Sequence, residues 1–93
     1  MFIRFETMAM PSEHDHDRRG LIRLMLKMPA LRGALQIRSA TNANLLGLCG
    51  AYEDASAALE RLRKETTNSN RAAIEEYEEL CTELENDIIR MCQ

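Results

Sequence analysis

Apolar residues recur at alternating steps of three and four through most of the second half of the chain. One such run extends from Leu45 to Leu62, and a second extends from Ile74 to Met91. This is the spacing of helices that bury one narrow stripe, so it predicts two α-helices that pack as in a coiled coil. The stripe residues are Leu45, Leu48, Tyr52, Ala55, Leu59 and Leu62, followed by Ile74, Tyr77, Cys81, Leu84, Ile88 and Met91.

A polar segment separates the two stripes. Residues 66–70 read TTNSN, and these residue types favour turns and helix caps because their side chains hydrogen-bond to nearby backbone groups. If the chain reverses near residue 68, the stripes meet residue by residue, from Leu62 opposite Ile74 to Leu45 opposite Met91. We therefore predict an antiparallel helical hairpin over residues 43–92.

The first half of the chain also has a helical pattern. Ser12 followed by Asp15 is typical of a helix start, so a first helix is expected from about residue 13. Pro29 disfavours helical backbone in the residue before it, which ends this helix near Met28. The helical pattern then resumes and leads into the hairpin, with a polar soft spot at residues 39–44 where the helix can bend or restart.

The hairpin leaves residues 30–43 without a partner. The first helix has the length to fold back over them, with Leu24 against Ala34 and Leu21 against Ile37. An arrangement in which the first helix crosses onto a neighbouring subunit uses the same apolar faces. Both arrangements satisfy the sequence pattern.

These patterns predict an all-α fold of three helices. A long central helix forms an antiparallel, coiled-coil-like hairpin with the C-terminal helix, and the chain assembles as a helical bundle. The composition agrees, because two tyrosines, two phenylalanines and no tryptophan offer little material for strands. We expect one domain over residues 13–93, and a flexible tail over residues 1–12, which carry no pattern.

Residues 21–28 carry more apolar side chains than one buried stripe requires, since six of the eight are apolar. We interpret the surplus as a surface for a partner protein, bound as one helix is bound in a groove. Arginine and lysine among these residues would select an acidic partner. The expected partner-binding residues are Leu21, Leu24, Met25, Met28, Arg23 and Lys27.

Small residues form a further stripe beside the apolar stripe of the central helix. A glycine inside a helix costs about 1 kcal/mol relative to alanine, so two of them suggest the close approach of another helix. The alternative is a small, solvent-facing surface. On the first interpretation the chain is a homo-oligomer, with a dimer favoured. The expected self-association residues are Ala43, Gly47, Gly50, Ala57 and Ala58.

Charge is distributed unevenly along the chain, although the net charge is only −3. Six basic residues and no acidic residue lie between Arg18 and Tyr52, whereas residues 71–93 hold seven acidic residues and two arginines. A basic helix raises the alternative of a nucleic-acid-binding regulator. The acidic total and the shortage of aromatic side chains for base stacking weigh against it. The residues concerned are Arg18, Arg19, Arg23, Lys27 and Arg32.

No group of residues has the spacing of a catalytic or metal site. Cys49 is the candidate nucleophile, but the two histidines, His14 and His16, lie in the expected helix cap and not beside it. The His-Asp-His-Asp run at residues 14–17 fits a solvated helix start better than a metal site. Three cysteines without a C-x-x-C pair fit a reducing cytoplasm.

The sequence contains no apolar run long enough for a signal peptide or a membrane span. Because no catalytic or metal-ligand spacing is found, we expect no enzyme activity, no cofactor and no bound metal. The predicted function is a cytoplasmic protein-protein interaction module, such as a small helical regulator, adaptor or chaperone-like protein. It would self-associate and dock apolar helix faces on a partner protein.

Overall fold

The computed structural model describes residues 13–65 and 70–93, and the chain forms no strand within these ranges. The elements are α2 (Glu13–Lys27), the 3₁₀ helix η1 (Pro29–Leu31), α3 (Arg32–Ser39), α4 (Ala43–Lys64) and α5 (Arg71–Met91). The all-α class is confirmed, but the described part holds four α-helices where three were predicted. The predicted tail, residues 1–12, and residues 66–69 of the predicted turn lie outside the described residues.

The first predicted helix corresponds to α2, and Pro29 sets its end. The backbone of Met28 has φ −126° and ψ 74°, outside the helical region, as expected for a residue that precedes proline. Its N–H still donates to the Leu24 carbonyl at 2.8 Å, which completes the last turn of α2. Pro29 then occupies the first turn of η1, where its missing N–H is not needed.

The predicted long central helix is wrong, because the chain breaks between α3 and α4. Asn42 has an extended backbone, and its side-chain oxygen accepts a hydrogen bond from the Leu45 N–H at 3.1 Å. An asparagine in this capping position stabilises a helix start by about 1 kcal/mol. The polar soft spot at residues 39–44 is therefore a restart, and α3 is a separate short helix.

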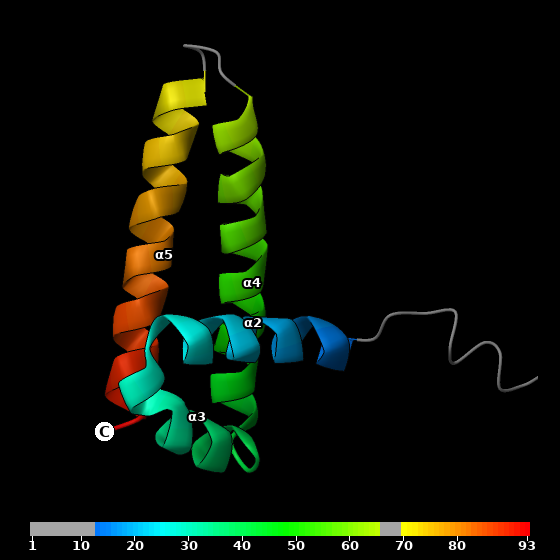
Figure 1. Ribbon diagram of the computed structural model, residues 1–93, viewed down its shortest axis with the longest axis vertical. Helices are drawn as coiled ribbons and strands as arrows, with labels where there is room; N and C mark the ends of the chain where they lie inside the picture. The colour runs from blue at the N-terminus through cyan, green and yellow to red at the C-terminus, as the bar shows by residue number, and fades with distance from the viewer. Residues whose placement is uncertain (1–12, 66–69) are drawn as a thin grey trace, which may run out of the picture.

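The helices α4 and α5 lie side by side in opposite directions, and α2 lies across α4, with α3 beneath it (Figure 1). Polar side-chain contacts between the described residues join α4 to α5. Arg63 donates to Glu78 at 2.7 Å, Ser56 Oγ lies 3.9 Å from Cys81 Sγ, and Tyr52 donates to Glu85 at 2.6 Å.

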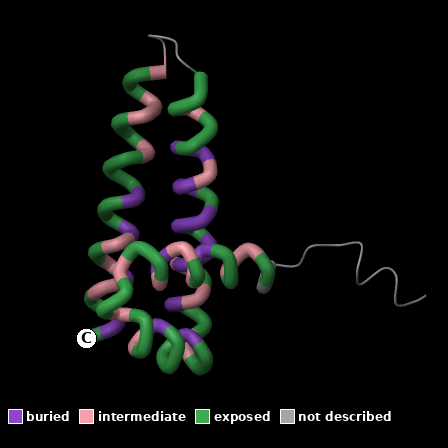
Figure 2. Tube along the Cα trace, in the orientation of Figure 1, coloured by how far each residue is buried: buried purple, intermediate pink, exposed green. Residues whose placement is uncertain are grey.

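The core lies at the end of the molecule where α2 and α3 cover α4 and α5 (Figure 2). Its fully buried members come from all four α-helices and are Leu24, Leu35, Leu45, Cys49 and Ile88. Ile74 and Tyr77, near the other end of α5, are only half-buried. The side chains of α2 and α3 therefore complete the core at one end of the α4–α5 pair, whereas the other end of α5 is less buried.

The backbones of α2 and α4 touch where the two helices cross. A Cβ added to Gly20 would lie 1.7 Å from the carbonyl oxygen of Cys49, and one added to Gly50 would lie 2.0 Å from Oδ1 of Asp17. Two glycines thus allow the close approach. The main partner of α2 is α4, and the expected buried layer of Leu21 against Ile37 is wrong, because Ile37 is 74% exposed.

Candidate docking groove

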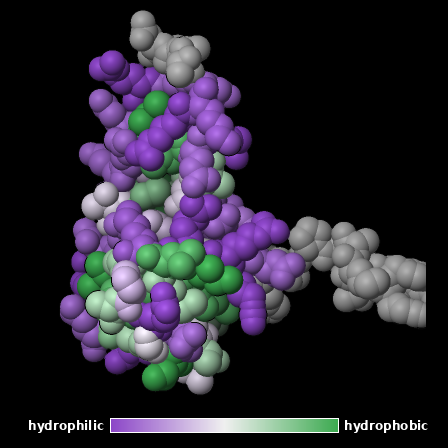
Figure 3. All heavy atoms as spheres, viewed as in Figure 1, coloured by the Kyte–Doolittle hydropathy of each residue, from purple (hydrophilic) through white to green (hydrophobic). Residues whose placement is uncertain are grey.

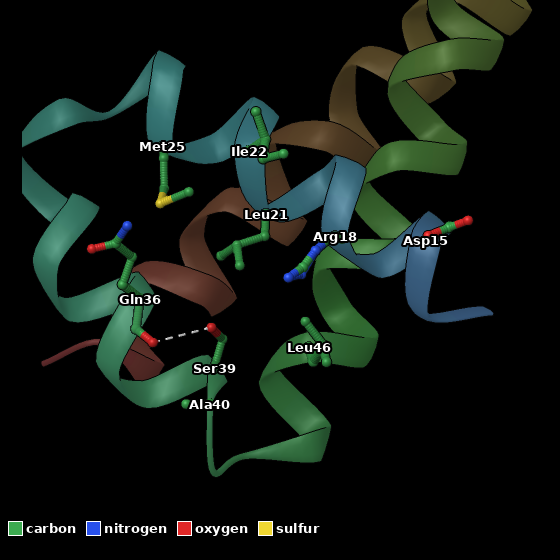
Figure 4. A pocket seen from close by; sticks show the side chains of 9 residues that line it. All are labelled: Asp15, Arg18, Leu21, Ile22, Met25, Gln36, Ser39, Ala40 and Leu46. Carbon is green, nitrogen blue, oxygen red and sulfur yellow. Dashed lines mark hydrogen bonds between the residues drawn. The ribbon is translucent and has the colours of Figure 1, made fainter. Parts of the chain in front are cut away.

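A groove of 780 Å³ opens between α2, α3 and the first turn of α4. Leu21 and Met25 point from α2 toward α3, and Arg18 projects into the same space (Figure 4). The lining residues are Asp15, Arg18, Leu21, Ile22, Met25, Gln36, Ser39, Ala40 and Leu46. The groove is thus apolar along its middle and carries charge at the Asp15 and Arg18 end.

The spacing of residues on α2 creates the apolar wall of this groove. Four lining residues lie on one side of α2, because they follow one another at steps of three, one and three: Arg18, Leu21, Ile22 and Met25. Ile22 is 48% exposed. On the face that Figure 3 shows, hydrophobic residues gather over α2 and α3, whereas the far part of α4 and α5 is mainly hydrophilic. The structure therefore leaves an apolar patch where α2 and α3 meet.

The six predicted partner-binding residues do not form one surface. Leu21 and Met25 line the groove, and Met28 is half-buried beside the core. Leu24 has no exposed surface, so its prediction as a docking anchor is wrong: it packs inside the chain with Leu35 and Cys49. One stripe of α2 is therefore core, and its neighbouring stripe is the free surface.

Arg23 and Lys27 are engaged within the chain. Arg23 donates to Glu53 at 3.0 Å and to Glu60 at 2.8 Å, and Lys27 donates to Glu85 at 2.5 Å. These hydrogen bonds raise the pKa of Arg23 and of Lys27 and outweigh the opposite effect of burial. Carboxylates of α4 and α5 thus already hold both cations, and their role in selecting a partner stays a prediction.

Glu85 is the centre of a small polar network between α2, α4 and α5. It accepts hydrogen bonds from Lys27 and, at 2.6 Å, from the Tyr52 hydroxyl. Burial opposes the ionisation of Glu85, but these two donors outweigh it and lower its pKa below 4.5. Burial, together with the carboxylate, raises the pKa of Tyr52. The network ties the end of α2 to the α4–α5 pair.

The predicted self-association stripe is divided by the fold. Gly50 is buried under Asp17 of the same chain, and Ala58 is buried as well, so neither is free for a second copy. Ala57 is half-buried. Only Ala43 and Gly47 are exposed, and nothing lies within 4 Å of a Cβ added to Gly47. For Gly50 the interpretation is corrected, because this position receives α2 of its own chain; Ala58 is buried within the chain.

The groups considered for catalysis and metal binding are separated. Cys49 is fully buried, and burial above all, then the charge of Asp17 and the nearby Cys92, raises its pKa to about 11. Its thiol is thus protonated near neutral pH. His16 contacts Asp54 at 2.6 Å, while the side chain of His14 lies outside the described residues. The described residues contain no group of three or more potential metal ligands.

Several lining residues of the groove escaped the sequence reasoning. Leu46 lies outside the heptad stripe, and Gln36, Ser39 and Ala40 belong to the segment between the breaks at Pro29 and Asn42, whose placement the pattern does not give. Ile22 belongs to the apolar surplus of residues 21–28, which was the available signal. Its exposure follows from the direction in which α2 crosses α4.

Comparisons with known protein families, with characterised proteins and with solved structures found no match. Of the helices that the structure describes, none combines the length and the apolarity needed to cross a lipid bilayer.

Proposed function

We propose that the chain is a non-enzymatic protein-interaction module that holds an acidic amphipathic helix of a partner protein in the groove between α2 and α3. The observation that carries the proposal is the groove itself, an apolar channel with Leu21, Ile22 and Met25 along one wall. Pockets that receive an apolar helix face use anchors of this kind, and methionine adapts its shape to the side chains it meets.

The charge around the groove favours an acidic partner. Arg18 lines the groove, and Arg32 lies one helical turn before Gln36, on the same face of α3. None of the ion pairs within the described ranges involves Arg18 or Arg32. Both arginines are exposed. They therefore take over the selecting role that Arg23 and Lys27 were expected to have.

The rest of the chain serves as a scaffold in this proposal. In this proposal α4 and α5 form a coiled-coil-like hairpin, which is supported by the contacts between Tyr52 and Glu85 and between Arg63 and Glu78. Lys27 and Arg23 fix α2 on this hairpin through Glu85 and Glu53. Three buried free cysteines suit a reducing cytoplasm, where we place the module.

A pair of matched variants on α2 tests the groove. Ile22 lines the groove and is 48% exposed, whereas Leu26 is 71% exposed on the same helix but does not line it. The probe is a synthetic helical peptide with leucines on one face and glutamates on the other, measured by fluorescence polarisation. Ile22→Glu should weaken binding at least about tenfold, which corresponds to 1.4 kcal/mol. Leu26→Glu should leave binding within about twofold of the unmodified chain.

A lysine version of the peptide and a mixed set of RNA and DNA oligonucleotides complete the test. The lysine peptide should not bind, because Arg18 and Arg32 repel it. Equal binding of both peptides, or equal loss with both variants, would contradict the proposal. Oligonucleotide binding that falls steeply with salt would instead favour the nucleic-acid alternative. Two of its five predicted residues, Arg23 and Lys27, are already held by carboxylates.

A further inference from the structure

The chain itself carries an acidic amphipathic helix. Glu76, Glu79 and Glu83 are exposed on α5, and none of them forms an ion pair within the described ranges. Leu80 lies among them and is 40% exposed, as one of four exposed large apolar residues in the part of the chain that the structure describes. The neighbouring side of α5 is buried through Cys81, Leu84 and Ile88. Leu80 therefore lies at the edge of the buried stripe, among exposed carboxylates.

We infer that the groove of one copy holds the acidic face of α5 of a second copy, with Leu80 against the apolar wall and Glu76 and Glu83 beside Arg18 and Arg32. This inference rests on the proposed function, since it names the partner helix of the same groove. The charge complementarity is its main support. The arginines lie on α2 and α3 and the carboxylates lie on α5, and no ion pair among the described residues joins the two sets.

The spacing of the two faces agrees. Glu76 and Glu83 are seven residues apart, which is about 10 Å along a helix, and Leu80 lies between them. Arg18 and Met25 are also seven residues apart on α2, so the apolar wall has the same length. Arg32 precedes Gln36, a lining residue, by one turn of α3. In the proposed contact Leu80 lies along the apolar wall, with Glu76 and Glu83 toward its two ends.

Two copies can exchange this contact reciprocally. Each copy offers one groove and one acidic helix, so a two-fold arrangement uses both and leaves neither open. This interface differs from the small-residue stripe that the sequence suggested, of which the fold covers Gly50 and Ala58. It would also give Arg18 and Arg32 the carboxylate partners that they lack among the described residues.

Charge reversal on separate copies tests the inference. One variant carries Arg18→Glu with Arg32→Glu, and the other carries Glu76→Arg with Glu83→Arg; all four positions are exposed, so both variants should fold. Each variant alone should be monomeric by sedimentation velocity, because like charges meet at both contacts. An equimolar mixture should form dimers, because opposite charges then meet at both. Glu75→Arg, on another face of α5, is the control and should dimerise as the unmodified chain does.

The outcomes separate this inference from the proposed function. Dimers of the unmodified chain that weaken with salt, together with rescue in the mixture, support the inference. An unmodified chain that stays monomeric at every concentration overturns it, as does dimerisation of either variant alone. If the chain is monomeric yet binds the synthetic glutamate peptide through Ile22, the docking function stands and only the identity of the partner is wrong. If it neither dimerises nor binds the peptide, both proposals fall.

Discussion

The contact between Gly20 and α4 gives the sharpest test of the fold. Gly20 is buried, and a Cβ in its place would lie 1.7 Å from the Cys49 carbonyl oxygen and 2.5 Å from the carbonyl carbon. These are backbone atoms, so no side-chain rotation can relieve the overlap. Gly20→Ala would therefore have to push α2 away from α4 by about 1 Å or more, enough to disturb dispersion contacts at the crossing.

Two opposing effects set the size of the change. Alanine stabilises a helix by about 1 kcal/mol relative to glycine. Overpacking typically costs about 1–3 kcal/mol and more where the backbone must move, and Leu24 and Cys49 lie fully buried at this contact. We expect a net loss of about 2 kcal/mol in the free energy of unfolding. For a domain of this size that lowers Tm by about 8–16 °C.

The same substitution elsewhere should have the opposite sign. Gly33 and Gly47 are exposed helical glycines, and a Cβ added to either meets nothing within 4 Å. Gly33→Ala and Gly47→Ala should therefore each raise stability by up to about 1 kcal/mol. Thermal unfolding followed by circular dichroism at one fixed protein concentration compares the three variants. A Gly20→Ala variant as stable as Gly47→Ala would refute the close crossing of α2 and α4.

Two further predictions concern the charged contacts of α2. Arg23→Met should lower the free energy of unfolding by about 1–3 kcal/mol, because Glu53 is 9% exposed and loses its donor. In urea denaturation, the double variant Arg23→Met with Glu53→Leu should recover most of this loss. If the losses of the two single variants simply add in the double variant, the pairing of Arg23 with Glu53 is contradicted. Because the folded chain lowers the pKa of Glu85, the stability that its ionisation contributes is present above pH 4.5 and is lost as the pH falls through the folded pKa. The gap in Tm between the unmodified chain and Glu85→Gln should thus narrow from pH 6 toward strong acid, and a gap that stays constant would argue against the network with Lys27 and Tyr52.

Features decided by neighbours within one helical turn could be predicted from the sequence. The end of α2 follows from Pro29, and the buried positions Cys81, Leu84 and Ile88 follow from the stripe of α5. Residues 39–44 were identified as a soft spot, but a bend and a restart share the same signal. The hydrogen bond from the Leu45 N–H to Asn42 shows that the chain restarts there, and the polar residues alone favour a bend equally well.

Residue types alone could not predict whether a surface packs against its own chain or against another molecule. A glycine stripe predicts a close approach, but the same stripe accepts a helix of its own chain or of another copy. Gly50 proved to meet Asp17 of α2. In the same way, Arg23 is expected to bind acidic residues of a partner, but in the structure it pairs with Glu53 and Glu60 of its own chain. Once α2 is placed across α4, Leu24 becomes core and Ile22 becomes surface.

The crossing at Gly20 also has a consequence for how any survey of substitutions is interpreted. Gly20 does not line the groove, yet it sets how deeply α2 is seated on α4, and the wall that carries Ile22 moves with it. A larger residue at Gly20 would tilt that wall and alter the groove's width without touching a ligand. Selections that score binding alone would then rank Gly20 beside the true contact residues, and only a parallel stability score would separate the two.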